Sequence, residues 1–548
     1  LLYRGFAQTE KSREMSRILK WFSCLAVLGT TCFGIPAGGQ EVIVHDYDNV
    51  YQWQTEINSP RVPAEPGYQT RAFLWIPPQC EKVKAVLICG HNAMEEGVIE
   101  SSEFRRGLSD MDMALVWVSP GWEPSDLFYV PNGAQDGFEE AMEELAGKSG
   151  YDELRTVPVA YMSQSAQASS PYNFAAWNPD RALAIISMHG DSPLSEVLCC
   201  GHVNPYWGSR NIDGIPALMC VGEYEWGEFR IESAFPFMKR YPDATLSLLC
   251  DAGHSHSDCS EFEMEYILAF LRKAMEYRMD EEGHLRKLDK RDGWLADRWY
   301  PENRAPEQPY SIHAAPFAEY AGDRDSCFWY FDEEMAGLTE EYYLRERGKQ
   351  AQKLIAWQNG KPVDKIRFTP EEDGLTFHFQ VKYDGNGHSS SPIQIRREYG
   401  PVRIVNDTTF RITFHRTGFD GRKTGWMMLD CYANADNLYK RAILNLELRI
   451  PGRITDGQPQ TINFPGLNDV YAGTDEEIVL AATSSSGLPV SFYVESGPAV
   501  VKGDKLVLTE IPPRAKFPVE VTVVAWQYGI SGQWQSATPV KSVFRIWK

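Results

Sequence analysis

The chain has few basic residues for its size. Its 548 residues include 54 Lys and Arg against 75 Asp and Glu, which gives a formal net charge of −21 at pH 7. A surface with this charge repels phosphate backbones and anionic lipid head groups. The sequence therefore predicts no nucleic-acid partner.

Motifs that bind metals or phosphates are also lacking. The sequence has no Cys-x-x-Cys pair and no His-Glu-x-x-His run, and the glycines at 201–208 lack the lysine of a phosphate-binding loop. His189-Gly190-Asp191 and the run 255–258 gather histidine and carboxylates, but without a ligand spacing of that kind. We predict neither a metal ion nor a cofactor.

Only one long apolar run occurs, near the beginning of the chain. Arg17 and Lys20 precede the apolar residues 21–35, and small residues follow at 37–39. This is the order of a secretory signal that starts at Met15, so we predict that residues 1–40 are an upstream extension and a signal peptide. The run is too short to span a bilayer comfortably. The protein is expected to be exported, to the periplasm, the outer-membrane surface or the medium.

Cysteine gives little support for a disulfide framework. Of 11 cysteines, Cys24 and Cys32 fall in the predicted signal, and the remaining nine are an odd number. Lipidation of Cys24 or Cys32 would attach the protein to the outer membrane, although residues 28–32 match a lipidation motif poorly.

The length predicts two to four domains, and the apolar pattern divides them. From about residue 70 to 275, short apolar runs alternate with amphipathic stretches, which is typical of a doubly wound α/β sheet. The predicted helices are 137–149 and 261–277. The predicted strands are 72–76, 85–89, 114–118, 157–161, 183–187, 217–221 and 245–249.

After residue 280 the composition and the apolar pattern change twice. Residues 281–359 are rich in charge, Pro and Trp, and we interpret them as a connector packed on the domain 41–280. From residue 360, alternating apolar and polar residues between Gly, Asn and Asp turns favour antiparallel strands. We predict a β-sandwich at 360–465 and an immunoglobulin-like sandwich at 466–548.

Residues 157–168 form an apolar run, then Ser163-Gln164-Ser165-Ala166-Gln167, then an Ala-rich helix start. This pattern resembles the nucleophile elbow of the α/β-hydrolase family, in which a serine occupies a tight strand-to-helix turn. The resemblance implies that Ser165 is the nucleophile and that the N–H of Ala166 donates to the oxyanion. Ser163 and Gln167 stand where the family pattern has glycine.

Two later segments follow the order of that family, in which an acid and then a base come after the nucleophile. An apolar run at 217–221 ends in Gly222-Glu223-Tyr224-Glu225, and a second at 245–249 ends before Gly253-His254. The resemblance implies Glu225 as the acid and His254 as the base, with Glu223 and His256 as alternatives.

An earlier segment supplies the fourth element. The apolar run 85–89 ends in Gly90-His91-Asn92-Ala93, which resembles the position of the oxyanion loop in lipases and esterases. The resemblance implies that Asn92 or Ala93 donates the second oxyanion hydrogen bond. His91, Gln164 and Trp226 are candidate substrate contacts.

Each segment alone has an ordinary structural explanation. Ser-x-Ser often caps a helix, and Gly-His at a strand end is often a simple turn. Their occurrence together, in one family's chain order, favours a serine hydrolase. With a signal in front and sandwiches behind, the layout resembles exported bacterial carbohydrate esterases, whose substrates are acetylated or feruloylated polysaccharides or oligosaccharides.

Two alternatives stay open at this point. One is an exported serine peptidase, which amide turnover would distinguish from an esterase. The other is a degenerate hydrolase that binds glycan without turnover, and Gln167 in place of glycine motivates it.

Overall fold

The computed structural model divides the chain into residues 1–42 and residues 43–548. All described residues belong to the second unit, and they are 50–57, 69–123, 127–194, 203–225, 227–299, 312–419, 425–474 and 477–548. The predicted signal, Cys24, Cys32 and Trp226 therefore lie outside the described residues. None of the described helices is long and apolar enough to cross a membrane.

The first part of the second unit is an eight-stranded sheet with helices. Its strands are β1 (Trp53–Glu56), β2 (Arg71–Trp75), β3 (Ala85–Cys89), β4 (Met113–Ser119), β5 (Val159–Gln164), β6 (Ala182–Met188), β7 (Ala217–Gly222) and β8 (Leu246–Asp251). Its helices are α2 (Glu95–Ile99), α3 (Ser102–Ser109), α4 (Ala134–Ser149), α5 (Ser170–Trp177), α6 (Gly227–Arg240) and α7 (Glu261–Arg278). Short 3₁₀ turns are Val130–Asn132, Asp152–Arg155 and Ser165–Gln167.

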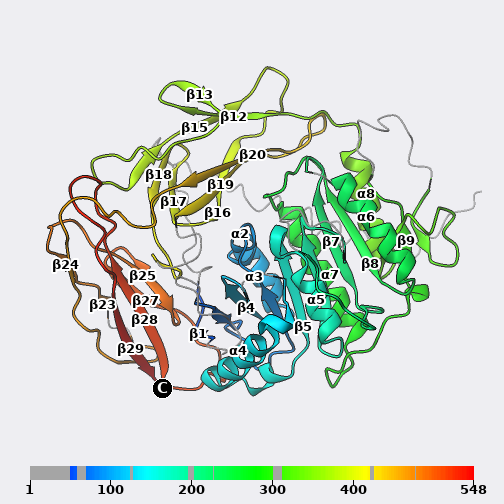
Figure 1. Ribbon diagram of the computed structural model, residues 1–548, viewed down its shortest axis with the longest axis horizontal. Coiled ribbons are helices and arrows are strands. Elements are labelled where there is room, and N and C mark those ends of the chain that lie inside the picture. The colour runs from blue at the N-terminus through cyan, green and yellow to red at the C-terminus, as the bar shows by residue number, and fades with distance from the viewer. Residues whose placement is uncertain are drawn as a thin grey trace, which may run out of the picture. The chain divides into compact units, whose positions relative to one another are not determined.

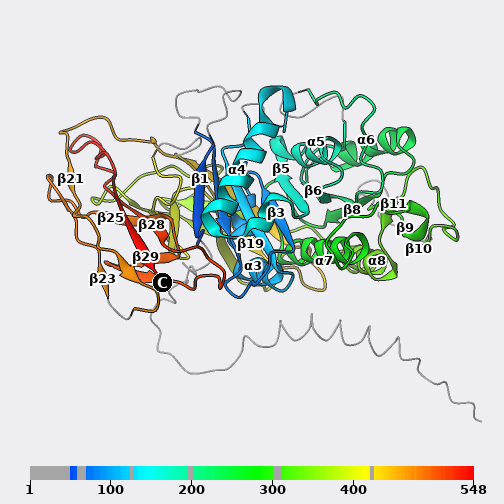
Figure 2. The ribbon, with the colours of Figure 1, turned by 90° about the horizontal axis from the view of Figure 1, so that it is seen from below.

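The strand order in this sheet is β1-β2-β4-β3-β5-β6-β7-β8 (Figure 1). β2 pairs antiparallel with β1 and with β4, whereas the strands from β4 through β8 pair in parallel. Figure 2 shows α4, α5 and α6 on one face of the sheet and α3 and α7 on the other. This arrangement confirms the predicted α/β-hydrolase fold class.

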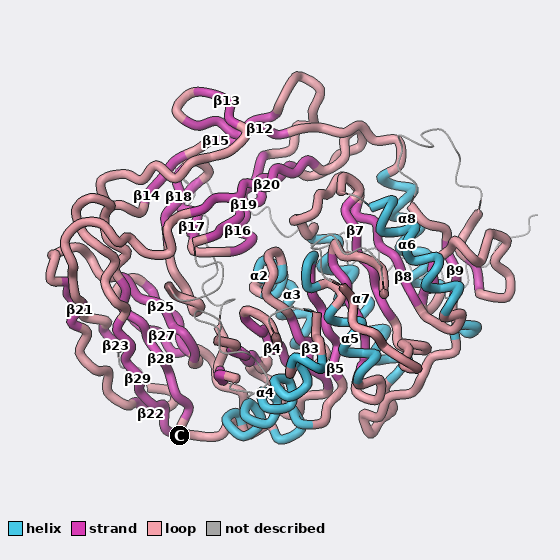
Figure 3. Tube along the Cα trace, viewed as in Figure 1, coloured by secondary structure: helices cyan, strands magenta, loops and turns pink. Residues whose placement is uncertain are grey.

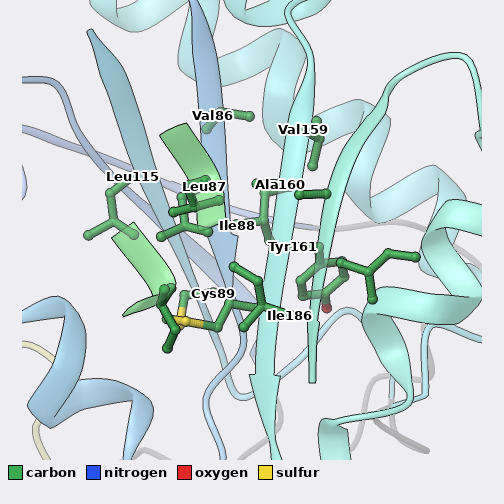
Figure 4. Close-up of a cluster of buried hydrophobic side chains, with 14 of the residues drawn as sticks. Val86, Leu87, Ile88, Cys89, Leu115, Val159, Ala160, Tyr161 and Ile186 are labelled. Atoms are coloured by element: carbon green, nitrogen blue, oxygen red, sulfur yellow. The ribbon is translucent and has the colours of Figure 1, made fainter. Parts of the chain in front are cut away.

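Buried apolar strands explain why the sheet forms here. Every residue of β3, β4, β5 and β6 is buried, as expected for parallel strands covered on both faces. Figure 4 shows the side chains of Val86, Ile88, Tyr161 and Ile186 packed together in this core. The parallel strands bring their carboxyl ends, and the loops that follow them, to one edge of the sheet.

The strand before Ser165 differs from its prediction. The apolar pattern predicts residues 157–161, but β5 runs from Val159 to Gln164. Pro158 has no N–H to add to the ladder, and the polar side chains of Ser163 and Gln164 are buried within the strand. The rigid strand therefore extends up to Ser165 itself.

A small sheet and a helix follow the first domain. They are β9 (Trp294–Ala296), β10 (Ala315–Pro316), β11 (Phe328–Tyr330) and α8 (Glu333–Glu346), with a 3₁₀ turn at Lys290–Asp292. Tyr343 accepts a hydrogen bond from the N–H of Cys250, and Tyr342 accepts one from the N–H of Ala252. These elements thus pack against the end of β8.

The rest of the described chain is strands and loops, and Figure 3 shows no helix in it after α8. Three small sheets cover residues 354–449: β12 (Leu354–Gln358), β13 (Lys361–Val363) and β15 (Gln380–Tyr383); β14 (Thr376–His378), β17 (Val402–Asn406) and β18 (Thr409–Ile412); β16 (Ile393–Tyr399), β19 (Trp426–Ala433) and β20 (Ala442–Arg449). The tail has β21 (Ile462–Asn463) with β24 (Thr483–Ser484); β22 (Val470–Tyr471), β25 (Ser491–Ser496), β28 (Val519–Trp526) and β29 (Val540–Trp547); β23 (Ile478–Val479), β26 (Ala499–Lys502) and β27 (Lys505–Leu508).

The two β regions have a common core. We call residues 354–449, which contain the first three of these sheets, the middle β region. Phe414 follows its strand β18, and the ring centroid of Phe414 is 5.1 Å from that of Trp526 in β28. Tyr528 belongs to the same buried cluster. The all-β character after residue 353 is therefore confirmed, while the immunoglobulin-like topology of the tail stays a prediction.

Candidate active site

The turn after β5 holds Ser165 in an unusual backbone conformation. Ser165 has φ of 55°, in the left-handed region that non-glycine residues seldom occupy. The 3₁₀ turn Ser165–Gln167 and then α5 follow at once. Strain of this kind persists only where the surroundings fix it, and it presents the side chain at the carboxyl edge of the sheet.

His256 lies directly in front of Ser165. Its Nε2 is 2.6 Å from Ser165 Oγ, and its Nδ1 is 2.7 Å from Glu225 Oε2. A carboxylate can only accept a hydrogen bond, so Nδ1 carries the proton and Nε2 is left to accept from the serine hydroxyl. The side chain of His256 is 35% exposed, whereas that of Glu225 is 2% exposed. The three side chains therefore form a chain that leads from solvent into the protein.

Glu225 is held in place by four groups. The N–H of Gly222 donates to its Oε1 at 2.7 Å, and His189 Nδ1 lies 2.8 Å from the same oxygen. Burial alone would raise the pKa of Glu225, but the charge of His189 and the hydrogen bonds from His189 and His256 hold that pKa well below its ordinary value. Arg230 adds to this effect. Glu225 is therefore an anion at neutral pH.

His189 places a second imidazole on the same carboxylate. It follows β6, its side chain is fully buried, and its Nε2 lies 3.5 Å from Glu263 Oε2 in α7. Burial by itself would lower the pKa of His189, but the charges of Glu225 and Glu263 hold it well above its usual value. The site thus contains a buried cation behind the acid, and the hydrogen-bonded series runs Ser165, His256, Glu225, His189, Glu263.

The structure does not bring the predicted base, His254, to Ser165. His254 is 2% exposed, its Nδ1 faces Asp258, and its Nε2 lies 3.4 Å from Asp251 Oδ2. Burial would lower the pKa of His254, but these two carboxylates raise it. A histidine enclosed by two carboxylates holds the loop together, and the alternative base, His256, takes the position facing Ser165.

Glu223, the alternative acid, also points elsewhere. Its Oε1 lies 2.6 Å from Lys440 Nζ, and its Oε2 accepts from the N–H of Gly253 at 2.8 Å. The carboxylate that contacts His256 is that of Glu225.

Gln167 has a structural role that the glycine pattern did not suggest. Its Oε1 accepts from the N–H of His91 at 3.1 Å, and its Nε2 donates to the carbonyls of His91 at 3.2 Å and Pro120 at 2.9 Å. A Cβ on Gly90 would lie 2.3 Å from Gln167 Oε1. Gly90, which follows β3, therefore leaves room for the side chain of Gln167, and this glutamine fixes the loop at residues 90–93.

The loop amides proposed as oxyanion donors already donate within the protein. The N–H groups of Asn92 and Ala93 donate to Oε2 of the buried Glu95 at 3.2 and 2.7 Å, and Oε1 of Glu95 accepts from the N–H of Gln164 at 2.9 Å. In this geometry neither loop amide points at a substrate oxygen. The N–H of Ala166 belongs to the first turn after Ser165, where helical amides lack an intrahelical acceptor.

Two of the candidate substrate contacts, Gln164 and His91, are buried. Gln164 Nε2 donates to the carbonyl of His256 at 3.0 Å, and its Oε1 accepts from Asn92 Nδ2 at 3.0 Å. His91 Nδ1 lies 2.7 Å from Ser119 Oγ. Gln164 and His91 are therefore used to join the loops around Ser165, and Trp226 lies outside the described residues.

His189, Glu225 and His256 are also close enough for a metal, since one ligand atom from each lies within 4.8 Å of the others. The nitrogens, however, face the carboxylate at hydrogen-bond distances of 2.7 and 2.8 Å. Two ligand atoms bound at about 2.0 to 2.2 Å to one tetrahedral metal ion would lie about 3.3 to 3.6 Å apart. The shorter contacts found here are those of hydrogen bonds.

Three contributors to the site had no useful sequence signal. In the sequence, His189 stands out only through the nearby Asp191, and Glu263 is one position in the predicted helix 261–277. Glu95 follows the predicted oxyanion loop by two residues, and glutamates are usually exposed. A buried carboxylate next to an oxyanion loop can be found only once its exposure is known.

No protein-family model and no curated protein matches the chain. Among solved structures, Est1E from Butyrivibrio proteoclasticus is 15% identical, with 41% of this chain and 98% of that chain covered and a TM-score of 0.28. Esterase PE8 is 16% identical, with 37% and 97% covered and a TM-score of 0.26. The S-formylglutathione hydrolase FrmB from Staphylococcus aureus is 10% identical, with 40% and 97% covered and a TM-score of 0.28.

Proposed function

We propose that this protein is a serine ester hydrolase in which Ser165, His256 and Glu225 form the catalytic triad. The observation that carries the proposal is the contact of Ser165 Oγ with His256 Nε2 at 2.6 Å, with Glu225 at 2.7 Å on the other side of the ring. The strained backbone of Ser165 supports the same role.

The geometry performs acyl transfer in two halves. In the first, Ser165 Oγ bonds to the ester carbonyl carbon while its proton passes to His256 Nε2, and the alcohol leaves with that proton as the C–O bond breaks. In the second, His256 takes a proton from water, the water oxygen bonds to the acyl carbon, and Ser165 regains its proton as the acid product leaves. Glu225 stabilises the imidazolium in both halves.

The oxyanion is proposed to form beside the N–H of Ala166. This amide belongs to the turn that starts at Ser165, so it faces the same space as the nucleophile. Asn92 or Ala93 would become a second donor by exchanging its hydrogen bond to Glu95 for one to the substrate oxygen, as the loop resemblance implies.

The proposed substrates are acetyl or feruloyl esters of a polysaccharide or an oligosaccharide. The secretory pattern at residues 1–40 and the β regions behind the catalytic domain support this choice. The same pattern supports a location in the periplasm, at the outer membrane or outside the cell. The hydrogen bonds of Gln167 favour a hydrolase over the glycan-binding alternative, since they show that a glutamine is accommodated in the turn after Ser165.

The test is hydrolysis of p-nitrophenyl acetate and methyl ferulate by the full chain and by Ser165→Ala. Ser163→Ala is a matched control, because Ser163 lies two residues earlier in the same motif and is fully buried. We expect turnover to vanish in Ser165→Ala and to persist in Ser163→Ala. Turnover that survives in Ser165→Ala would reject the proposal, and cleavage of a peptide p-nitroanilide in preference to the esters would favour a peptidase.

A further inference from the structure

The loop that carries His256 lies against the middle β region. We define the base loop as residues 253–259, between β8 and α7. Asn445 in β20 contacts it on both sides of His256: Asn445 Oδ1 accepts from Ser255 Oγ at 2.5 Å, and Asn445 Nδ2 donates to the carbonyl of Ser257 at 2.8 Å. One side chain, 189 residues further along the chain, therefore holds both neighbours of the residue that faces Ser165.

Asn445 is itself fixed from behind. Its Nδ2 also donates to Asp430 Oδ1 in β19 at 2.6 Å. β19 and β20 pair antiparallel with Asp430 opposite Asn445, so the sheet sets the position of the amide. An amide with its hydrogen bonds fixed in this way has little rotational freedom left.

Both ends of the base loop are tied to the same sheet. Arg396 in β16 donates to the carbonyl of Cys259 at 2.9 Å. At the other end, Gly253 has φ of +79°, and a Cβ there would lie 2.7 Å from the carbonyl oxygen of Arg441. The loop thus packs against the backbone that leads into β20, so closely that a side chain at residue 253 would not fit.

The same region also reaches the acid and the oxyanion loop. Lys440 Nζ lies 2.6 Å from Glu223, two residues before Glu225. Arg397 Nη2 lies 2.5 Å from Glu96 in α2, and Glu96 lies 3.3 Å from His91 Nε2. Groups of the middle β region therefore contact the base loop and the loop that carries Glu225, and they reach His91 through Glu96.

We infer that the sheet β16-β19-β20 is a structural part of the catalytic centre, and that Asn445 is a positioning residue that holds His256 toward Ser165 and Glu225. The inference rests on the proposed function. Its physical basis is that His256 makes two short hydrogen bonds in opposite directions, which requires a fixed ring orientation. Misplacement by about 1 Å costs about 10²-fold in rate.

The test compares Asn445→Ala with Gln358→Ala in the full chain. Gln358 is a matched control because it is a buried amide in β12 that also pins a neighbouring backbone, through hydrogen bonds of 2.8 and 2.9 Å to the carbonyl and N–H of Arg367. Active sites are counted by stoichiometric labelling with a fluorophosphonate, so that kcat refers to folded enzyme only.

We expect Asn445→Ala to lower kcat about 10- to 100-fold, with KM within about 2-fold and with slower fluorophosphonate labelling. Gln358→Ala should lower thermal stability to a similar degree and leave kcat per active site unchanged. Should Asn445→Ala not fold, Ser255→Ala removes the Oγ contact alone and is expected to lower kcat a few-fold.

Equal kcat per active site in Asn445→Ala and Gln358→Ala, with Ser165→Ala inactive, would overturn the positioning role and leave the proposed function standing. If Asn445→Ala does not fold, an unchanged kcat in Ser255→Ala would likewise overturn the positioning role. Activity that survives in Ser165→Ala would instead remove the proposed function and this inference together.

Discussion

The buried cation behind Glu225 should set the pH range of the enzyme. His189 and His256 contact the same carboxylate, and their ring centroids are 6.2 Å apart. Two positive charges at that distance repel each other by about 2.7 kcal/mol at an effective dielectric constant of about 20. The His256 side chain is about a third exposed, so solvent screening reduces the repulsion to about half.

The perturbation is His189→Asn, whose amide keeps a donor for Glu225 but removes the charge. Catalysis needs Glu225 as an anion, and the charge of His189 is the largest of the effects that lower the pKa of Glu225. Removal of that charge therefore makes protonation of the triad easier. The acidic limb of the kcat/KM profile should therefore move up by about one pH unit, at about 1.4 kcal/mol per unit. The assay is p-nitrophenyl acetate hydrolysis between pH 4 and 9.

The control is His284→Asn, since His284 is 80% exposed and pairs with Asp280, four residues earlier. That variant should leave the profile in place. The double variant His189→Asn with Glu263→Gln removes both members of the buried pair and should show the same upward shift without an unpaired carboxylate. An acidic limb that stays put or moves to lower pH in His189→Asn would refute the reasoning.

Three further outcomes follow from the contacts around the base loop. His256→Asn should abolish turnover. His254→Asn should keep measurable turnover and lose about 3 kcal/mol of unfolding free energy, because it removes the imidazole charge that lies between the buried carboxylates of Asp251 and Asp258. Urea unfolding and kcat measurements check these two outcomes. Glu225→Gln should lower kcat by about 10³- to 10⁴-fold at unchanged fold, which stopped-flow assays and circular dichroism can check. The thermal midpoint should fall as pH drops below about 4.5. The pKa values of Glu225 and Asp258 are held low in the folded state, so protonation of these two carboxylates removes stabilising charge. A midpoint that rises below about pH 4.5 would contradict this prediction.

The local pattern of apolar residues was enough to predict most strands of the main sheet. Apolar runs placed strands β2 to β8 of the main sheet within a few residues, because buried parallel strands need continuous apolar sequence. The edge strand β1 (Trp53–Glu56) was not predicted, since it is short and alternates buried with more exposed residues. The strand-turn-helix signal around Ser165 is likewise local. The resemblance to the α/β-hydrolase family, in which the acid and then the base follow the nucleophile, then indicated Ser165 and Glu225.

The choice between His254 and His256 was decided by the tertiary structure. The two histidines are two residues apart in one loop, and nothing in that spacing says which ring turns outward. Asp258 and Asp251 enclose His254, and Gln164 and Asn445 hold the backbone around His256, through contacts across 92 and about 190 residues of chain.

The sequence also could not predict how Gln167 is accommodated or that the β regions contact the loops around Ser165. Gln167 replaces an expected glycine, and only its approach to Gly90 from another strand shows that the space exists. Asn445 reads in the sequence as one polar residue on an alternating strand. Its partners come from distant segments that packing brings together, and hydrogen-bond partners of that kind have no periodicity or spacing along the chain.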